Sequence, residues 1–402
     1  MGPRRAPLKS GAFTGGAAGV CWTEAARPDG QLERDGEMRI FLIAAIGAVM
    51  TLNATCGASR STAREGVQKP HHTANGFQNN HPHEIHGFAD LFQWRWDRLW
   101  GHVPEGPREE REYEFPLAEN DPAYLRANRS ETTVTWIGHA TLLIQWHGIN
   151  LLTDPMFSER AFPVQWTGPQ RFAPLGLALQ DLPPIDVVLL SHNHYDHLDV
   201  DTVGYLKDQR GAGQGPRFFV PLGLKAWFAD QGIDDVVELD WWEHESYMGL
   251  EIHAVPAQHF SSRTPFDRNE TLWAGWVVAA PGFRFYYSGD TGYSTDFQEI
   301  GRRLGPMDFS AIPIGAYAPR WFMKAVHVNP EEAVRIHREV GSRLSVGIHW
   351  GTFSLTDEAL DEPPIRLAAA VKSSRLPGGS FFVMQHGETR LLDGLLVARD
   401  AR

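Results

Sequence analysis

Cysteine is nearly absent from this chain of 402 residues, which contains only Cys21 and Cys56. Two cysteines cannot build a disulfide framework, and their isolation excludes a metal site made of thiolates. Basic residues are also in the minority, because 37 Lys and Arg stand against 49 Asp and Glu, a formal net charge of −12. This acidity argues against a protein that binds nucleic acid through its overall charge. Any bound metal must therefore be held by His, Asp and Glu.

Long hydrophobic runs are scarce as well. The run Ile40 to Leu52 is short for a membrane span, but it has the length and the flanking charge of a secretory signal core. Residues 1–37 are rich in Gly, Pro, Ala and Arg without periodicity, which predicts a disordered or untranslated extension and a true start at Met38. Small residues surround Cys56, as at bacterial lipoprotein cleavage sites. Residues 38–56 are thus predicted to be a signal or lipoprotein-like segment that places the chain in the bacterial cell envelope, membrane-associated and facing the periplasm.

The sequence is compatible with more than one form of processing at Cys56. Lipidation, plain cleavage and an uncleaved anchor all fit the sequence around it. Residues 57–130 follow as a polar linker and an arm rich in histidine and aromatic residues, His81 to Trp100. These histidines lack a tight metal motif, so we expect the arm to pack its aromatic residues onto the domain, with contact to a membrane surface as the alternative.

A globular domain is predicted over residues 131–395. Short β-branched and aromatic runs separated by turn residues predict strands, and the first three form an antiparallel opening. The segment Asn329-Pro330-Glu331-Glu332 predicts a capped helix start, with the helix running through Val340. Two halves in which strands are followed by helices predict an α/β fold, an αβ/βα sandwich. The predicted strands are 133–138, 141–146, 149–154, 185–190, 217–220, 236–239, 251–255, 272–279, 284–287 and 344–348, and the other predicted helices are 201–209 and 224–231.

The densest chemical signal is the segment Ser191 to Asp199, Ser-His-Asn-His-Tyr-Asp-His-Leu-Asp. It follows the apolar run 185–190, so it lies on a loop at the carboxyl end of a buried strand, where α/β sheets place their chemistry. Several imidazoles and a carboxylate in one short loop are costly to bury unless a cation holds them. The segment therefore predicts zinc or a similar divalent metal, with the ligands His192, His194, Asp196 and His197.

Three further positions follow predicted strands in the same way, namely His259, Asp290 and His349. Each alone is typical of a turn or cap residue. Together with the loop they make seven ligands, which is enough for two metal ions.

These motifs make the chain similar to the metallo-β-lactamase superfamily over residues 131 to about 390, and within it to the N-acylphosphatidylethanolamine-hydrolysing phospholipase D family. The blocks that carry the resemblance are Thr135 to Thr141, Ser191 to Asp199, Pro256 to His259, Gly289 to Tyr293, Ile312 to Tyr317, Pro319 to Met323, His327 to Ala333 and Ile348 to Phe353. The resemblance implies a four-layer sandwich and a bacterial member of the family.

The resemblance also implies the ligand sets. One zinc would be held by His192, His194 and His259, the other by Asp196, His197 and His349, with Asp290 bridging. Two zinc ions about 3.5 to 4 Å apart can share a hydroxide, because metal binding lowers the pKa of water toward 7. That hydroxide would attack phosphorus and release phosphatidic acid and an N-acylethanolamine from a phospholipid substrate. Asp290, Asp196 and His327 are the expected catalytic residues.

Three residues are expected to contact the substrate. His327, just before the capped helix, would stabilise the phosphate or the leaving oxygen, and Tyr195 and Tyr317 are lesser candidates. The alternatives are another hydrolase on the same metals, such as a lactonase, β-lactamase or ribonuclease, or a metal-binding envelope protein without turnover. The expected partners are a phospholipid and a membrane surface, not nucleic acid, and a homodimer is among the assemblies that the sequence leaves open.

Overall fold

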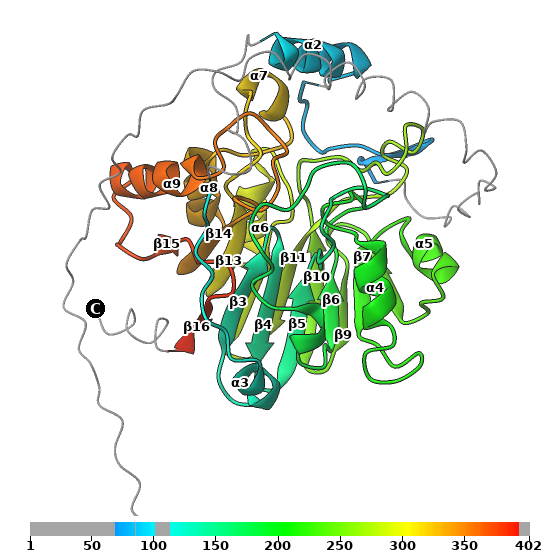
Figure 1. Ribbon diagram of the computed structural model, residues 1–402, viewed down its shortest axis with the longest axis vertical. Coiled ribbons are helices and arrows are strands. Elements are labelled where there is room, and N and C mark those ends of the chain that lie inside the picture. The colour runs from blue at the N-terminus through cyan, green and yellow to red at the C-terminus, as the bar shows by residue number, and fades with distance from the viewer. Residues whose placement is uncertain (1–68, 85, 101–112, 394–402) are drawn as a thin grey trace, which may run out of the picture. The chain divides into compact units, whose positions relative to one another are not determined.

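The computed structural model describes residues 69–84, 86–100 and 113–393 (Figure 1). The extension predicted at 1–37 and the signal-like segment predicted at 38–56 lie outside the described residues. None of the described helices is long and apolar enough to cross a membrane.

Two mixed sheets of seven strands each form the centre of the domain, and both have antiparallel and parallel pairs. The first sheet runs in the order β16-β3-β4-β5-β6-β7-β8 and the second in the order β15-β14-β13-β12-β11-β10-β9. The strands of the first sheet are β3 Thr133–Gly138, β4 Thr141–Trp146, β5 Ile149–Thr153, β6 Val187–Leu189, β7 Arg217–Pro221, β8 Val236–Leu239 and β16 Thr389–Leu391. Those of the second are β9 His244–Tyr247, β10 Leu250–Val255, β11 Gly275–Ala280, β12 Phe283–Tyr287, β13 Phe309–Pro313, β14 Leu344–Ile348 and β15 Phe381–Phe382.

The main core lies between the two sheets. Because successive side chains of a strand point to opposite faces, each strand contributes to two cores. In β12, Phe285 and Tyr287 pack in the core between the sheets, whereas Tyr286 packs in a second core under helices. In β4, Leu142 and Leu143 divide in the same way, with Leu143 in the core under α4 and α5.

Helices cover the outer face of each sheet, as Figure 1 shows for α4 beside β6 and β7, and for α8 beside β13 and β14. This arrangement is the predicted αβ/βα sandwich of four layers. The capping box predicted at Asn329 is present, since its side chain accepts from the Glu332 backbone N–H and the Glu332 carboxylate accepts from the Asn329 N–H. The helices of the domain are α3 Pro122–Ala127, α4 Val200–Leu206, α5 Lys225–Asp230, α6 Asp296–Leu304, α7 Arg320–Met323, α8 Pro330–Glu339 and α9 Glu362–Ser373, with one 3-10 turn, η3 Leu179–Asp181.

The arm before the domain contains a short hairpin and one helix: β1 His72–Thr73, β2 Gly76–Phe77 and α2 Phe88–Leu99. The hairpin segment is tied to the domain by Asp240, whose carboxylate accepts from His71 at 2.6 Å and pairs with Lys69 at 2.7 Å. Helix α2 is held by Trp94, which is buried, stacks on Phe322 and donates to Asp357 at 2.6 Å. Part of the arm thus packs on the domain as predicted.

Two predicted strands begin or end at residues that differ from those in the structure. Strand β6 covers only Val187–Leu189 of the apolar run 185–190, because only these residues pair with both neighbouring strands. Strand β11 begins at Gly275 and not at residue 272, since the preceding residues leave the sheet and the Ala274 N–H donates to the Ser191 carbonyl oxygen at the metal-ligand loop. Helices α3, α6, α7 and α9 and strands β9, β13, β15 and β16 were not predicted.

Candidate metal centre

The seven predicted ligands come from four loops that follow β6, β10, β12 and β14. These strands belong to both sheets, and their loops meet where the two sheets lie against each other. The structure brings the seven side chains into two adjacent groups. We call His192, His194 and His259 the three-histidine group, and Asp196, His197 and His349 the mixed group.

The three-histidine group presents three ring nitrogens to one point. His192 Nε2 lies 2.8 Å from His194 Nδ1, which lies 3.3 Å from His259 Nε2. Burial is the main cause that lowers the pKa of each of these rings, to about 4 for His194. The rings are therefore neutral at pH 7, and a neutral imidazole offers the lone pair that a metal requires.

The mixed group converges on Asp290. The Asp290 Oδ2 atom lies 3.1 Å from both His197 Nε2 and His349 Nε2, and 4.0 Å from His259 Nε2 of the other group. Asp196 Oδ2 lies 3.3 Å from His197 Nε2 and 3.4 Å from His349 Nε2. Asp290 thus occupies the position between the two groups that a bridging ligand requires.

Carboxylates dominate the electrostatics of the mixed group. Burial opposes protonation of His197, but the negative charges of Asp290, Asp196 and Asp154 outweigh burial and raise its pKa well above the usual range. Burial also opposes protonation of His349, but Asp290 and Asp196 outweigh it and raise its pKa to about 9. Burial also opposes the ionisation of Asp290, yet the neighbouring imidazoles lower its pKa well below the usual range. The mixed group is accordingly an anionic cavity that binds positive charge.

Few side chains of the centre are exposed to solvent. Asp196 and His327 side chains are 14% and 13% exposed, and His194 is also partly exposed, whereas the other five ligands are buried. His327 lies between the groups, with its ring 5.2 Å from that of His259 and 5.5 Å from that of His349. Burial lowers the pKa of His327 to about 4, so its ring is neutral at pH 7. A substrate must approach past these three side chains.

Comparisons with known proteins identify the family and the fold of the chain. Residues 149–350 match the model of a beta-lactamase superfamily domain. An N-acyl-phosphatidylethanolamine-hydrolyzing phospholipase D of Caenorhabditis elegans is 43% identical over 268 residues, which make up 63% of this chain and 74% of that protein. The chain belongs to this phospholipase D family within the metallo-β-lactamase superfamily. An uncharacterized protein of Mycobacterium tuberculosis is 44% identical over 263 residues, which make up 64% of this chain and 68% of that protein.

Solved structures show the same fold. A protein from Veillonella parvula described as a possible metal-dependent hydrolase has a TM-score of 0.53 at 19% identity, with 65% of this chain and 100% of that chain covered. A metallo hydrolase from Ignicoccus hospitalis has a TM-score of 0.50 at 21% identity, and the match covers 65% of this chain and 98% of that chain. Family membership and fold together support a metal-dependent hydrolase that binds a divalent metal.

The residues of this family member fit such a metal. Several buried polar atoms have no hydrogen-bond partner among the described residues, including Asp290 Oδ1, His349 Nε2 and His327 Nδ1. Leaving such atoms unpaired is costly, and a divalent cation coordinated by carboxylate oxygen and imidazole nitrogen removes that cost. His and Asp donors without thiolates suit zinc and several other divalent metals.

Two residues outside the predicted set support the mixed group. Asp154 follows β5, is fully buried, and accepts from His197 Nδ1 at 2.5 Å and from the hydroxyls of Ser191 and Tyr287. A carboxylate on the second ring nitrogen fixes the tautomer of a metal-binding histidine and raises its basicity.

His139 follows β3 and is the second such residue. Its Nε2 lies 3.0 Å from Asp196 Oδ2, its backbone carbonyl oxygen accepts from the His349 N–H at 3.0 Å, and its ring lies 4.0 Å from the ring of His349. Burial is the main cause that lowers its pKa to about 3, so the neutral ring donates Nε2–H to the Asp196 carboxylate, which can only accept. His139 and Asp154 both follow strands, so the rule that found His259, Asp290 and His349 could have found them too.

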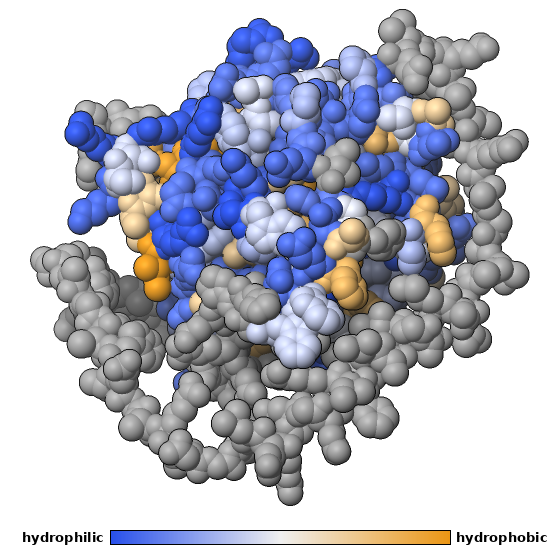
Figure 2. Space-filling view, turned by 90° about the horizontal axis from the view of Figure 1, so that it is seen from above, coloured by the Kyte–Doolittle hydropathy of each residue, from blue (hydrophilic) through white to orange (hydrophobic). Residues whose placement is uncertain are grey.

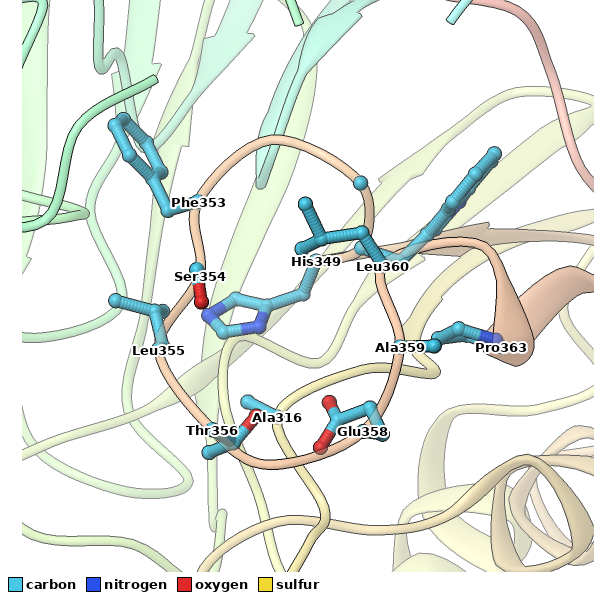
Figure 3. A pocket seen from close by; sticks show the side chains of 12 residues that line it. Ala316, His349, Phe353, Ser354, Leu355, Thr356, Glu358, Ala359, Leu360 and Pro363 are labelled. Atoms are coloured by element: carbon cyan, nitrogen blue, oxygen red, sulfur yellow. The ribbon is translucent and has the colours of Figure 1, made fainter. Parts of the chain in front are cut away.

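The far side of His349 faces a small cavity of about 10 Å³. Figure 3 shows the His349 ring inside a loop that carries Ser354, Thr356 and Glu358, with one ring nitrogen on the side of Thr356 and Glu358. Burial raises the pKa of Glu358, whose carboxylate accepts from the Ala318 N–H. The cavity next to His349 thus has a few polar side chains among mainly apolar ones.

The two predicted tyrosine contacts have different surroundings. Tyr195 is partly exposed beside Asp196 and packs against the Arg263 guanidinium, which lies 4.0 Å from its ring. Tyr317 is only 1% exposed, and its hydroxyl donates to Glu362 at 2.7 Å. The structure therefore keeps Tyr195 at the opening and places Tyr317 in the core, where it cannot touch a substrate without a rearrangement.

Proposed function

We propose that the chain is a phospholipase D type phosphodiesterase that uses two zinc ions to hydrolyse N-acylphosphatidylethanolamine-like phospholipids to phosphatidic acid and N-acylethanolamine. The observation that carries the proposal is the convergence of seven metal-binding side chains into two groups that share Asp290, in a chain of this family. Two zinc ions held there would supply a nucleophile from water at neutral pH and neutralise the oxygens of a phosphodiester.

The residues at the opening admit the substrate, donate a hydrogen bond to it and orient Asp196. His194 and Asp196 border the path by which the phosphodiester reaches the centre. His327 is neutral, and its Nδ1 lies 3.9 Å from Asp290 Oδ2. A neutral ring there can donate one hydrogen bond to a phosphate oxygen or to the leaving oxygen as negative charge develops on it. His139 keeps Asp196 oriented from behind.

Isotope labelling tests the bond that is cleaved. The enzyme is incubated with N-acylphosphatidylethanolamine vesicles in ¹⁸O-labelled water, and attack on phosphorus must place the label in phosphatidic acid. Label in the N-acylethanolamine would mean attack on carbon, and release of free fatty acid alone would mean that the enzyme is an acyl hydrolase. The variant His327→Ala should lower turnover while the metal content stays unchanged, and loss of metal would make His327 a structural residue.

A membrane surface fits the exposed aromatic residues of the arm. Phe92, Trp96 and Trp100 are 67%, 48% and 60% exposed, and their rings follow one another along α2 at 6.0 and 5.5 Å. Amphipathic aromatic side chains at this spacing suit the boundary between lipid headgroups and acyl chains. Figure 2, which looks down from above the view of Figure 1, shows separate orange side chains on a mainly blue surface, so such a contact would rely on individual side chains.

Sedimentation with phospholipid vesicles tests the proposed membrane contact of α2. Replacing Phe92, Trp96 and Trp100 together by Ser should weaken vesicle binding without changing metal content. The matched control is Ile365→Ser, which removes an equally exposed apolar side chain from α9. Equal binding by the triple variant and the control would contradict a membrane role for α2.

The location that we propose is the bacterial cell envelope, facing the periplasm. It rests on the signal-like segment 38–56, which would bring the enzyme to its lipid substrate. Fractionation with and without Cys56→Ala, together with mass analysis of the mature N-terminus, tests this location. A protein that starts with an intact Met1 in the cytoplasmic fraction would contradict it.

A further inference from the structure

An arginine that forms no hydrogen bond or ion pair with any described residue lies near the three-histidine group. The loop between His259 and β11 carries Arg263 and Arg268, and their surroundings differ. Arg263 is bound in place, because its Nη1 donates to the carbonyl oxygens of Asn193 and Leu198 at 2.9 and 2.7 Å. The Arg268 side chain is exposed and forms no hydrogen bond or ion pair within the described part of the chain.

The contact printed for Arg268 is with Phe260, which packs against the three-histidine group. Its guanidinium lies 4.3 Å from the centre of the Phe260 ring. That ring in turn lies 4.5 Å from the ring of His194 and 4.9 Å from the ring of His259. The Phe260 ring therefore contacts both the positive charge of Arg268 and two predicted ligands of the three-histidine group.

No neighbouring carboxylate neutralises this charge. Asp267, the adjacent residue, has its carboxylate turned to its own loop, where it accepts from the backbone N–H groups of Arg263 and Thr264. The opening thus has a cation that remains free to pair with an incoming group.

We propose that Arg268 recognises the negative charge of the substrate phosphodiester and selects lipids whose headgroup carries no positive charge. This proposal rests on the proposed function and deepens it. Phosphatidylethanolamine has a protonated amine next to its phosphate and is neutral overall. Acylation of that amine gives an uncharged amide, so the N-acylated lipid keeps a single negative charge. Arg268 attracts the phosphate of both lipids but repels the ammonium group of only one.

The size of the effect follows from Coulomb's law. Two unit charges about 8 Å apart, at an effective dielectric constant between 20 and 80, change an equilibrium constant by roughly 2- to 30-fold. Because Arg268 is exposed, its contribution should shrink as salt is raised from low to physiological concentration. The effect should appear in KM and not in kcat, since a charge at the opening acts on binding.

Three variants test the proposal. Arg268→Gln removes the charge, Arg268→Lys restores it, and Lys372→Gln on α9 removes one positive charge from an exposed position elsewhere. The substrates are N-acylphosphatidylethanolamine and phosphatidylethanolamine dispersed in an uncharged detergent, so that membrane surface charge does not enter. Metal content is measured for each variant. A second readout is the dissociation constant of a non-hydrolysable, singly charged phosphonate monoester, measured by calorimetry on the zinc-loaded protein.

The expected result is a fall in the preference for the N-acylated lipid by roughly 2- to 30-fold in Arg268→Gln, with recovery in Arg268→Lys and no change in Lys372→Gln. Phosphonate binding should weaken by a similar factor. An unchanged preference together with unchanged phosphonate affinity would overturn the role of Arg268. If neither lipid is cleaved but phosphonate binding still depends on Arg268, the proposed function fails while the anion-binding role of Arg268 stands.

Discussion

The two halves of the metal centre differ in what holds their ligands. In the three-histidine group the outer contacts are neutral, since His192 Nδ1 pairs with the Ser191 hydroxyl and His259 Nδ1 with the Val326 carbonyl oxygen. In the mixed group the outer contacts are the Asp154 carboxylate on His197 and the His139 ring on Asp196. The mixed group is also more anionic, because Asp196 and Asp154 both belong to its side of Asp290.

This difference predicts unequal metal affinity. A carboxylate behind a histidine ligand makes the ligand more basic, and buried negative charge attracts a cation more strongly than neutral rings do. The three-histidine group has neither advantage, and His194 is open to solvent. We therefore expect the metal of the mixed group to be held more tightly and the metal of the three-histidine group to leave first.

The largest effect is expected from Asp290→Asn, which removes the charge shared by both halves. Activity should fall by more than about 100-fold, beyond the range typical of outer contacts, and both metals should bind more weakly. Metal analysis and a phosphatidic acid assay measure the two results. A variant that keeps both metals and full activity would show that Asp290 does not link the halves.

A smaller effect is expected from Asp154→Asn, which leaves every ligand in place. The mixed group should lose about 10- to 100-fold in metal affinity, while the three-histidine group changes little. The control is Asp240→Asn, which alters a buried aspartate that binds the arm and not the centre. Chelator competition measures both affinities, and an equal loss in the two groups would remove the distinction between them.

The smallest effect is expected from His139→Asn, because His139 supports Asp196 with a single hydrogen bond from an uncharged ring. The mixed group should lose about 10-fold in metal affinity or less. The matched control is His253→Asn, on β10 away from the ligands. Visible absorption of the cobalt-substituted protein reports the geometry of each half, and a spectrum that changes only in the three-histidine group would contradict the assignment of His139.

The seven predicted ligands, which the structure brings together, came from a local signal in the sequence. Four of them fall within six residues after one apolar strand, and the others end strands of their own. It did not single out Asp154 or His139, because one polar residue after a strand is usually a turn residue. Their roles arise only when separate strands meet: Asp154 and its partner His197 are 43 residues apart.

Two other features depended on tertiary packing in the same way. Tyr317 lies within one of the blocks that carry the family resemblance, but its burial against Glu362 of α9 is decided by the fold. The free state of Arg268 is visible only once the partners of Asp267 are known. The arrangement of two sheets with outer helices followed from strand and helix patterns. The short edge strands β9 and β16 carried too few residues to stand out, and the central strand β13 was missed as well.

The most direct test of the unequal halves is a chelator titration of the zinc-loaded protein followed by native mass spectrometry. The wild-type protein should hold two zinc ions per chain and pass through a populated state with one. In that state the Asp154→Asn and His139→Asn variants should bind the remaining ion more weakly than wild type does. Loss of both ions in a single step, or a one-zinc state that neither variant affects, would contradict a centre whose two halves differ in the way described.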